Sequence, residues 1–296
     1  MAGSNANPSS CGNRPGNFYG GCGELGFDLT QLVVAPTLSY RVAPGHSFGI
    51  SPLLAYQQIR VYGLQAFQPL SKHPDDVTNQ GYDQAFGAGV RVGWFGQVRP
   101  WLDLGAAYAT RTYMQDFDEY RGLLAGGNFD IPANFSLGLA LKDENVTLAM
   151  DLQRIYFGQV RALGNGVLDT LQDPQGKPLG SEEGSGFNWR NQTNYRMTLI
   201  VHATTRLDLR VGAAYSRLAQ ADTTADTAGL AALTPNPALN LTTGFSWRWR
   251  DHSELHFAYG RYARGEYQGD SALFPGATEK VDPRVDTIYL GWTKTW

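Results

Sequence analysis

Apolar and polar residues alternate with a period of two along most of this chain. Between Leu102 and Arg111, for example, Leu104 and Tyr108 fall on the same side as Leu102, whereas Asp103 falls on the side of Arg111. A β-strand points successive side chains to opposite faces, whereas a helix repeats about every 3.6 residues. The pattern therefore predicts strands that each have one apolar face and one polar face.

Eleven segments carry this alternation. They are 28–42, 47–63, 81–96, 100–114, 132–142, 145–158, 187–203, 205–218, 238–250, 252–265 and 284–296. Most of them are longer than the usual strand of about 5–6 residues. A tilted strand needs roughly 9–11 residues to cross a membrane, so the lengths favour membrane-crossing strands.

The connections between these segments alternate between short and long. Short turns are expected at 43–46, 97–99, 143–144, 204 and 251, and long loops at 64–80, 115–131, 159–186, 219–237 and 266–283. Outer-membrane barrels of bacteria combine short periplasmic turns with long extracellular loops. The sequence therefore predicts an all-β fold, an antiparallel transmembrane β-barrel over 28–296, preceded by a Gly-rich extracellular loop over 1–27.

Composition and charge exclude other classes of protein. The 24 Lys and Arg residues nearly balance 27 Asp and Glu residues, giving a net charge of −3. The chain has no block of basic residues, so nothing indicates a nucleic-acid partner. The chain contains no run of eighteen apolar residues, so the sequence predicts no membrane-spanning helix. The mean hydropathy of −0.31 fits apolar lipid-facing rows averaged with polar rows.

The N-terminus and the histidines give little sign of other chemistry. The first residues have neither the charged nor the apolar region of a signal peptide. Cys11 and Cys22 could form a disulfide or remain two free thiols. His252 and His256 share a strand face but lie roughly 13 Å apart along it, too far to bind one zinc ion. We expect no metal, no cofactor and no enzymatic activity.

The polar rows of the strands are expected to face the barrel lumen. An Arg that faces lipid at the membrane midplane costs about 2–4 kcal/mol. The predicted lumen residues are Asp103, Arg111, Asp151, Arg190, Arg196, Asp208, Arg210, Arg248 and Glu254. They could form an ion-pair network that fills the barrel, or a path that guides an acidic substrate. The alternation along 145–158 would place Arg154 on the lipid-facing side of its strand. Either a bulge near Gln153 or a position above the hydrocarbon would avoid this.

Six stretches resemble, in order, the FadL/TodX family of outer-membrane transporters for long-chain fatty acids and aromatic hydrocarbons. They are 27–42, 49–57, 114–124, 129–135, 151–156 and 186–189, and the resemblance covers about residues 27–260. It implies a 14-stranded barrel plugged by an N-terminal hatch. The eleven segments would be its last eleven strands, so the signal peptide, the hatch and the first three strands would have no counterpart here. The kinked third strand, which provides the family's lateral exit, would also be absent. Residues 219–237 depart from the family pattern.

The resemblance also implies a site. In the family, the third and fourth extracellular loops form an apolar landing groove, which corresponds to 64–80 and 115–131. The residues expected to bind substrate there are Leu64, Phe67, Leu70, Phe117, Tyr120, Leu123, Leu124, Phe129 and Ile131. So many apolar side chains in exposed loops are typical of a binding surface. Alternatively, they pack the two loops against each other as a lid.

The function implied by the resemblance is passive transport of hydrophobic compounds across the cell outer membrane. The alternatives are a general porin-like or structural barrel and, less favoured, a barrel enzyme. The expected partners are hydrophobic small molecules, outer-membrane lipid and lipopolysaccharide, and the outer-membrane assembly machinery. That machinery selects final strands ending in an aromatic residue, as this chain does at Trp296.

Overall fold

The computed structural model describes residues 11–12, 14–17, 19–216, 239–250, 252–263, 267–270, 278–281 and 284–294. The predicted loop 219–237, the first ten residues of the predicted N-terminal loop and Trp296 lie outside the described residues.

The strands follow the predicted segments closely. They are β1 (Gly26–Val34), β2 (Leu38–Ala43), β3 (His46–Tyr62), β4 (Asp83–Arg99), β5 (Leu102–Ala109), β6 (Tyr113–Met114), β7 (Asn134–Lys142), β8 (Val146–Ile155), β9 (Gln192–Thr204), β10 (Leu207–Ser216), β11 (Leu239–Arg250), β12 (Ser253–Ala263), β13 (Tyr267–Asp270), β14 (Thr278–Val281) and β15 (Arg284–Lys294). The hairpin of β13 and β14 was not predicted, and it lies within the expected loop 266–283.

Thirteen of these strands form one sheet in the order β1-β3-β4-β5-β7-β8-β9-β10-β11-β12-β15, with β2 and β6 continuing β1 and β5. Every pairing is antiparallel, and successive strands along the chain are neighbours. Among the described residues, no pairing joins β1 or β2 to β15. The predicted all-β antiparallel architecture with eleven long segments is confirmed.

Two predicted strands are interrupted. The segment 28–42 divides between β1 and β2 at Pro36, which has no N–H to donate to the ladder. Next to it, the Thr37 hydroxyl bonds the Ala35 carbonyl oxygen and lies 2.8 Å from the Ser51 hydroxyl. The segment 100–114 divides at Thr110, whose side chain accepts the Val90 N–H in place of a backbone carbonyl. Side chains thus replace ladder hydrogen bonds at both breaks.

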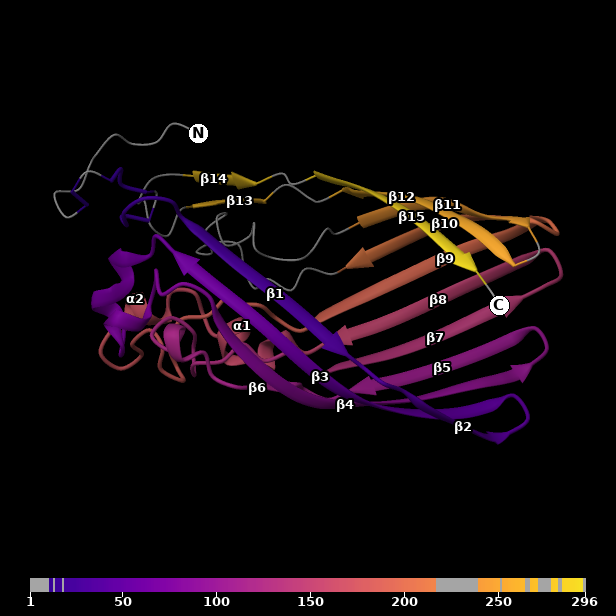
Figure 1. The fold of residues 1–296 in the computed structure, drawn as a ribbon, viewed down its shortest axis with the longest axis horizontal. Helices are drawn as coiled ribbons and strands as arrows, with labels where there is room; N and C mark the ends of the chain where they lie inside the picture. The colour runs from indigo at the N-terminus through magenta and orange to yellow at the C-terminus, as the bar shows by residue number, and fades with distance from the viewer. Residues whose placement is uncertain are drawn as a thin grey trace.

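Short and long connections lie at opposite ends of the sheet, as predicted (Figure 1). We call these the turn end and the loop end. The loop end carries the 3₁₀ helices η1 (Gln65–Leu70), η2 (Pro74–Asp76), η3 (Asp118–Tyr120) and η4 (Phe157–Gln159), and the short helices α1 (Arg161–Gly164) and α2 (Asp169–Gln172). Within the described ranges, no helix combines the length and apolar character needed to span a membrane.

The two faces of the sheet differ as the alternation predicts. Large apolar side chains stand exposed on the outer face, among them Leu137 on β7, Met150 on β8 and Trp247 on β11. Arg154 lies on this outer face opposite Phe135, one residue before β8 ends, and donates a 2.6 Å hydrogen bond to Thr193. Both ladders of β8 run without a register shift, which excludes the bulge near Gln153, one of the two alternatives for Arg154.

Candidate functional site

Three long connections pack onto the inner face of the sheet at the loop end. Their apolar side chains form one buried cluster with strand residues, which we call the loop cap. It consists of Ala55, Ile59, Val61, Ala85, Met114, Phe117, Tyr120, Leu124, Phe129, Val160, Ala162, Leu163 and Trp189. The inward residues Gln57, Ile59 and Val61 of β3 and Ala85 of β4 are buried here, because they meet loops and not open lumen.

The residues expected to bind substrate divide into two groups. Phe117 and Tyr120 are fully buried, and Leu124 and Phe129 are at most 9% exposed. Leu64, Leu123 and Ile131 are half-buried and pack against the cap, and Phe67 and Leu70 are half-buried on η1. The structure therefore brings seven of the nine together in one cluster. The four buried side chains fill the interior of the cap, and the five half-buried ones are partly accessible from outside.

Tyr120 ties the second of these loops to strand β3. Its phenol accepts a 3.1 Å hydrogen bond from the Val61 N–H and donates a 2.5 Å bond to the Gly81 carbonyl oxygen. Burial raises the pKa of the Tyr120 phenol above its ordinary value, so the group stays protonated and able to donate.

Hydrogen bonds and an ion pair join the loops to one another. The Ser71 hydroxyl donates to the Gly122 carbonyl oxygen at 2.6 Å, and the Lys72 N–H donates to Leu179 at 2.9 Å. Arg121 bonds Asp76 at 2.6 Å. At Gly122 a Cβ would lie 2.1 Å from the His73 carbonyl oxygen, so the loops approach too closely there for any side chain.

Sequence reasoning missed the third loop of the cap. Residues 156–191 supply Val160, Leu163 and Trp189, which are nearly fully buried. The rings of Phe157 and Trp189 meet edge to face with centroids 5.2 Å apart. An apolar run at helical spacing from 157 to 163 was the available signal.

The N-terminal segment lies beside η1. Cys11 and Cys22 form a disulfide with a Cα–Cα distance of 5.4 Å, which resolves the two alternatives left open by the sequence. The Cys22 N–H donates to the Gln65 side chain at 3.0 Å, and the rings of Tyr19 and Phe67 lie 6.1 Å apart. This part of the predicted loop 1–27 therefore contacts η1 directly.

Two of the predicted lumen residues, Asp103 on β5 and Arg111 just after it, form ion pairs with residues outside the predicted lumen set. Asp103 on β5 pairs with Lys142 on β7 at 2.6 Å. Arg111 pairs with the buried Asp130 and also donates to the Gln159 carbonyl oxygen at 3.2 Å. The Arg111 pair thus attaches the end of β5 to the loops of the cap.

Near the turn end, a row of polar contacts crosses six strands on the inner face. We call it the inner belt, and it runs through Thr147, His202, Asp208, Arg210, Ser246, His256 and Thr293. His202 and Asp208 lie 2.8 Å apart, and Ser246 bonds both Arg210 and His256. The prediction that Asp208 and Arg210 face inward agrees with this placement.

The remaining predicted lumen residues are less connected. Arg196 donates to Gln153 at 3.0 Å, and Arg248 donates to the Thr205 carbonyl oxygen at 3.0 Å. Glu254 lies directly across from Arg248 in the ladder. Asp151 makes no hydrogen bond or ion pair with any described residue, and its Oδ1 lies over Gly138. Arg190 lies before β9 begins and is not part of the ladder.

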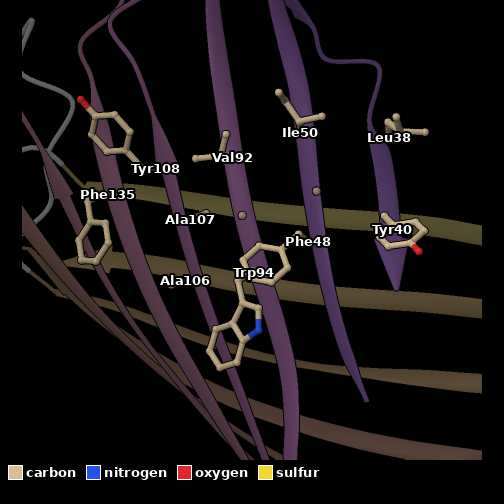
Figure 2. Close-up of a pocket in the computed structure, with 12 residues that line it drawn as sticks. Leu38, Tyr40, Phe48, Ile50, Val92, Trp94, Ala106, Ala107, Tyr108 and Phe135 are labelled. Carbon is tan, nitrogen blue, oxygen red and sulfur yellow. The ribbon is translucent and has the colours of Figure 1, made fainter. Parts of the chain in front are cut away.

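An apolar groove of about 470 Å³ lies on the outer face across β2, β3, β4, β5 and β7. Figure 2 shows its side chains, which include Tyr40, Phe48, Trp94, Tyr108 and Phe135. The Trp94 ring stacks on His46 beside the turn end, with centroids 5.8 Å apart. Aromatic side chains at this level are typical of the interface between a membrane and water. Among the described residues, no group of three His, Cys, Asp or Glu side chains could hold a metal ion.

Comparison with known proteins rests on structure. No protein-family model matches the chain, and no curated protein matches it in sequence. Among solved structures, the toluene transporter TodX of Pseudomonas putida is 18% identical with a TM-score of 0.60, over 91% of this chain and 70% of that one.

Two further solved structures give similar values. The toluene transporter TbuX of Ralstonia pickettii is 15% identical with a TM-score of 0.57, over 92% of this chain and 69% of that one. A FadL homologue of Pseudomonas aeruginosa is 16% identical with a TM-score of 0.57, over 90% of this chain and 66% of that one. The fold expected from the resemblance is therefore confirmed: this chain has the antiparallel β-barrel fold shared by these hydrocarbon and FadL-type transporters.

Proposed function

We propose that the chain acts in the outer membrane as a passive transporter of hydrophobic compounds, either long-chain fatty acids or aromatic hydrocarbons. The observation that carries the proposal is the loop cap, which fills the inner face at the loop end with apolar side chains. A general porin or structural pore needs an open, polar mouth at this position. The fold shared with toluene transporters and a FadL homologue supports the same assignment.

Capture at the loops is the finer part of the proposal. Because Phe117 and Tyr120 have no exposed surface, an incoming molecule first meets the half-buried side chains around them. Leu64, just before η1, and Phe67 and Leu70 on η1 have apolar side chains that are partly accessible. We assign initial capture to these three, and to Phe117, Tyr120, Leu124 and Phe129 the role of the packed support beneath them. Lipopolysaccharide around the loop end and the assembly machinery at the last strand remain expected partners.

The test measures uptake of a fatty acid and of toluene by cells whose outer membrane carries the full chain and lacks other transporters for these compounds. Phe67→Asp is expected to lower uptake of both about tenfold, since a charge replaces the apolar contact. Phe67→Leu should retain uptake. Ala66→Asp places the same charge on the neighbouring exposed residue and serves as the matched control.

Two results would contradict the proposal. Equal uptake by the Phe67→Asp and Ala66→Asp variants would show that hydrophobic compounds are not captured at η1. Passage of sugars at the same rate as hydrophobic compounds would favour a porin-like barrel. Assembly of every variant is checked by its resistance to unfolding in detergent.

A further inference from the structure

A small disulfide-closed structure in the N-terminal segment lies on η1, the helix that carries Phe67. We call it the clasp and define it as Cys11, Asn17, Tyr19, Gly21 and Cys22. The Cys11–Cys22 disulfide closes it, and the Asn17 N–H donates to the Gly21 carbonyl oxygen at 2.8 Å. The Asn17 side-chain oxygen accepts the N–H groups of Tyr19 and Gly21 at 3.1 and 2.9 Å. One disulfide and the hydrogen bonds of one asparagine therefore hold the clasp together.

The clasp is joined closely to the start of η1. The Asn17 side-chain amide donates to the Gly63 carbonyl oxygen at 2.7 Å. Both backbone groups of Cys22 bond the Gln65 side chain: its N–H donates at 3.0 Å, and its carbonyl oxygen accepts at 3.4 Å. A Cβ on Gly21 would collide with the Gly63 carbonyl oxygen, so the two segments meet backbone to backbone. No side chain could lie between them there.

The clasp also covers part of Phe67. The rings of Tyr19 and Phe67 meet edge to face, with centroids 6.1 Å apart and planes at 64°. Phe67 is half-buried, and it is not among the described side chains that pack against the loop cap. Binding of a hydrophobic molecule scales with the apolar surface that it can cover. The closed clasp therefore reduces the surface offered by the capture site, which consists of Leu64, Phe67 and Leu70.

A second set of contacts holds η1 without the clasp. Just before the helix, the Leu64 N–H donates to the Thr78 hydroxyl at 3.2 Å. At its end, the Leu70 carbonyl oxygen accepts the Leu179 N–H at 2.8 Å. Opening the clasp should therefore uncover Phe67 and leave η1 in place.

The disulfide is the contact whose loss would open the clasp. Gly20 and Gly23 have positive φ values of 74° and 80°, and glycine loses more conformational freedom than other residues when it is ordered. A disulfide offsets this cost, because it restricts the chain before the clasp forms. Without it, a few hydrogen bonds would have to order a glycine-rich segment.

A dithiol can break this disulfide by exchange. Cys22 is half-buried whereas Cys11 is 8% exposed, so the sulfur of Cys22 is the more accessible one. A thiolate of the reagent bonds that sulfur, the S–S bond breaks, and Cys11 leaves as a thiolate that takes up a proton. The second thiol of the reagent then displaces Cys22, which is also protonated. The reagent supplies the two electrons and ends as its own disulfide.

We propose that the clasp is a thiol-sensitive cover of the capture site. It limits access to Phe67 while the Cys11–Cys22 disulfide is intact, and it uncovers Phe67 when a dithiol reduces that disulfide. The inference rests on the proposed function, because it names how capture at η1 is regulated.

The test measures toluene binding to the purified full chain in detergent by ligand-observed NMR, before and after treatment with dithiothreitol. Reduction is expected to strengthen toluene binding about threefold, since more of Phe67 is uncovered. The variant that combines Cys11→Ser with Cys22→Ser should bind toluene as the reduced wild type does and should not respond to dithiothreitol. Hydrogen exchange at the Cys22 amide should become faster on reduction, whereas the Leu64 amide should keep its protection.

Asn17→Ala tests the clasp with the disulfide intact. It removes the hydrogen bond to Gly63, and it should strengthen toluene binding by less than reduction does. Asn128→Ala is the matched control, because Asn128 lies in the loop 115–131 and bonds Asp116 and the Gly126 carbonyl oxygen. Its toluene binding should equal that of the wild type.

Equal toluene binding before and after reduction would overturn the inference. Weaker binding after reduction would also overturn it, because the clasp would then support η1 and not cover it. A response to dithiothreitol in the double serine variant would show that the effect does not come from this disulfide. The proposed function survives these outcomes if Phe67→Asp still lowers uptake relative to Ala66→Asp. Tighter binding on reduction by a chain that mediates no uptake would overturn the proposed function and leave the clasp intact.

Discussion

The loop cap and the inner belt hold opposite ends of one sheet with different kinds of contact. In the cap, apolar side chains of 115–131 and 156–191 pack in one cluster with residues of β3 that lie more than 50 positions away in the chain, and Tyr120 also hydrogen-bonds Val61. In the belt, polar side chains join strands that are already neighbours, as Ser246 joins Arg210 and His256.

The difference follows from what each region must order. A loop has no ladder to fix its backbone, and ordering each residue costs roughly 1–2 kcal/mol, so it needs extensive apolar burial. Strand residues are fixed by the ladder before their side chains interact. A net gain of about 1 kcal/mol per hydrogen bond is then enough to join neighbouring side chains. Mutations in the two regions should therefore differ in how much stability they remove and in how far through the structure their effects extend.

The largest effect is expected in the interior of the cap. Phe117 has no exposed surface, and Phe117→Ala should destabilise the cap by about 3–5 kcal/mol, because it leaves a cavity among packed side chains. Hydrogen exchange of the amides in 115–131 measures the change. The strands near the turn end should keep their protection.

Phe67→Ala is the comparison for that experiment. Phe67 is half-buried at the edge of the cap, so its removal should cost clearly less. Equal losses for the two variants would show that the interior of the cap is no more tightly packed than its edge. Loss of protection throughout the sheet in Phe117→Ala would show that cap and sheet unfold as one unit.

A smaller effect is expected where the cap and the sheet share a polar contact. Tyr120→Phe removes the acceptor of the Val61 N–H and should cost about 1–2 kcal/mol, since that donor is left buried. The change should appear as faster exchange of the Val61 amide. Burial raises the pKa of the Tyr120 phenol, so the folded cap is more stable with this phenol neutral than with it ionised.

The pH dependence has a definite sign. With a folded pKa above the unfolded value of about 10, the stabilisation is complete below pH 10 and is lost as the pH rises through the folded value. Tyr120→Phe should lack this part of the alkaline loss. An identical alkaline profile in both proteins would mean that the ionisation of Tyr120 does not contribute to it.

The same contrast explains what the sequence could predict. Alternation along the strands placed Asp208, Arg210 and Arg248 on the inner face, because a ladder leaves each side chain only two directions. It could not show the break at Pro36 as the end of a strand, since the hydrogen bond from Thr37 to Ala35 depends on the folded backbone.

Prediction was weakest in the loops. The apolar content of 64–80 and 115–131 indicated burial or binding but not which side chains would be covered. Phe117 is enclosed only because the loop 156–191 returns to the same place and adds Val160 and Trp189. A sequence shows which charges exist but not which of them are paired.

The smallest effect is expected in the inner belt. Ser246 is 1% exposed and bonds both Arg210 and His256, so Ser246→Ala removes two hydrogen bonds but leaves the ladders of β10, β11 and β12 in place. The cost should be about 1 kcal/mol, measured as a small fall in Tm of the purified protein.

Ser136→Ala is the control, since Ser136 also faces inward and bonds no described side chain. A loss in Ser246→Ala as large as that in Phe117→Ala would mean that the belt, and not the ladder, orders these strands. Equal Tm values for the two serine variants would mean that the belt adds nothing beyond the ladder.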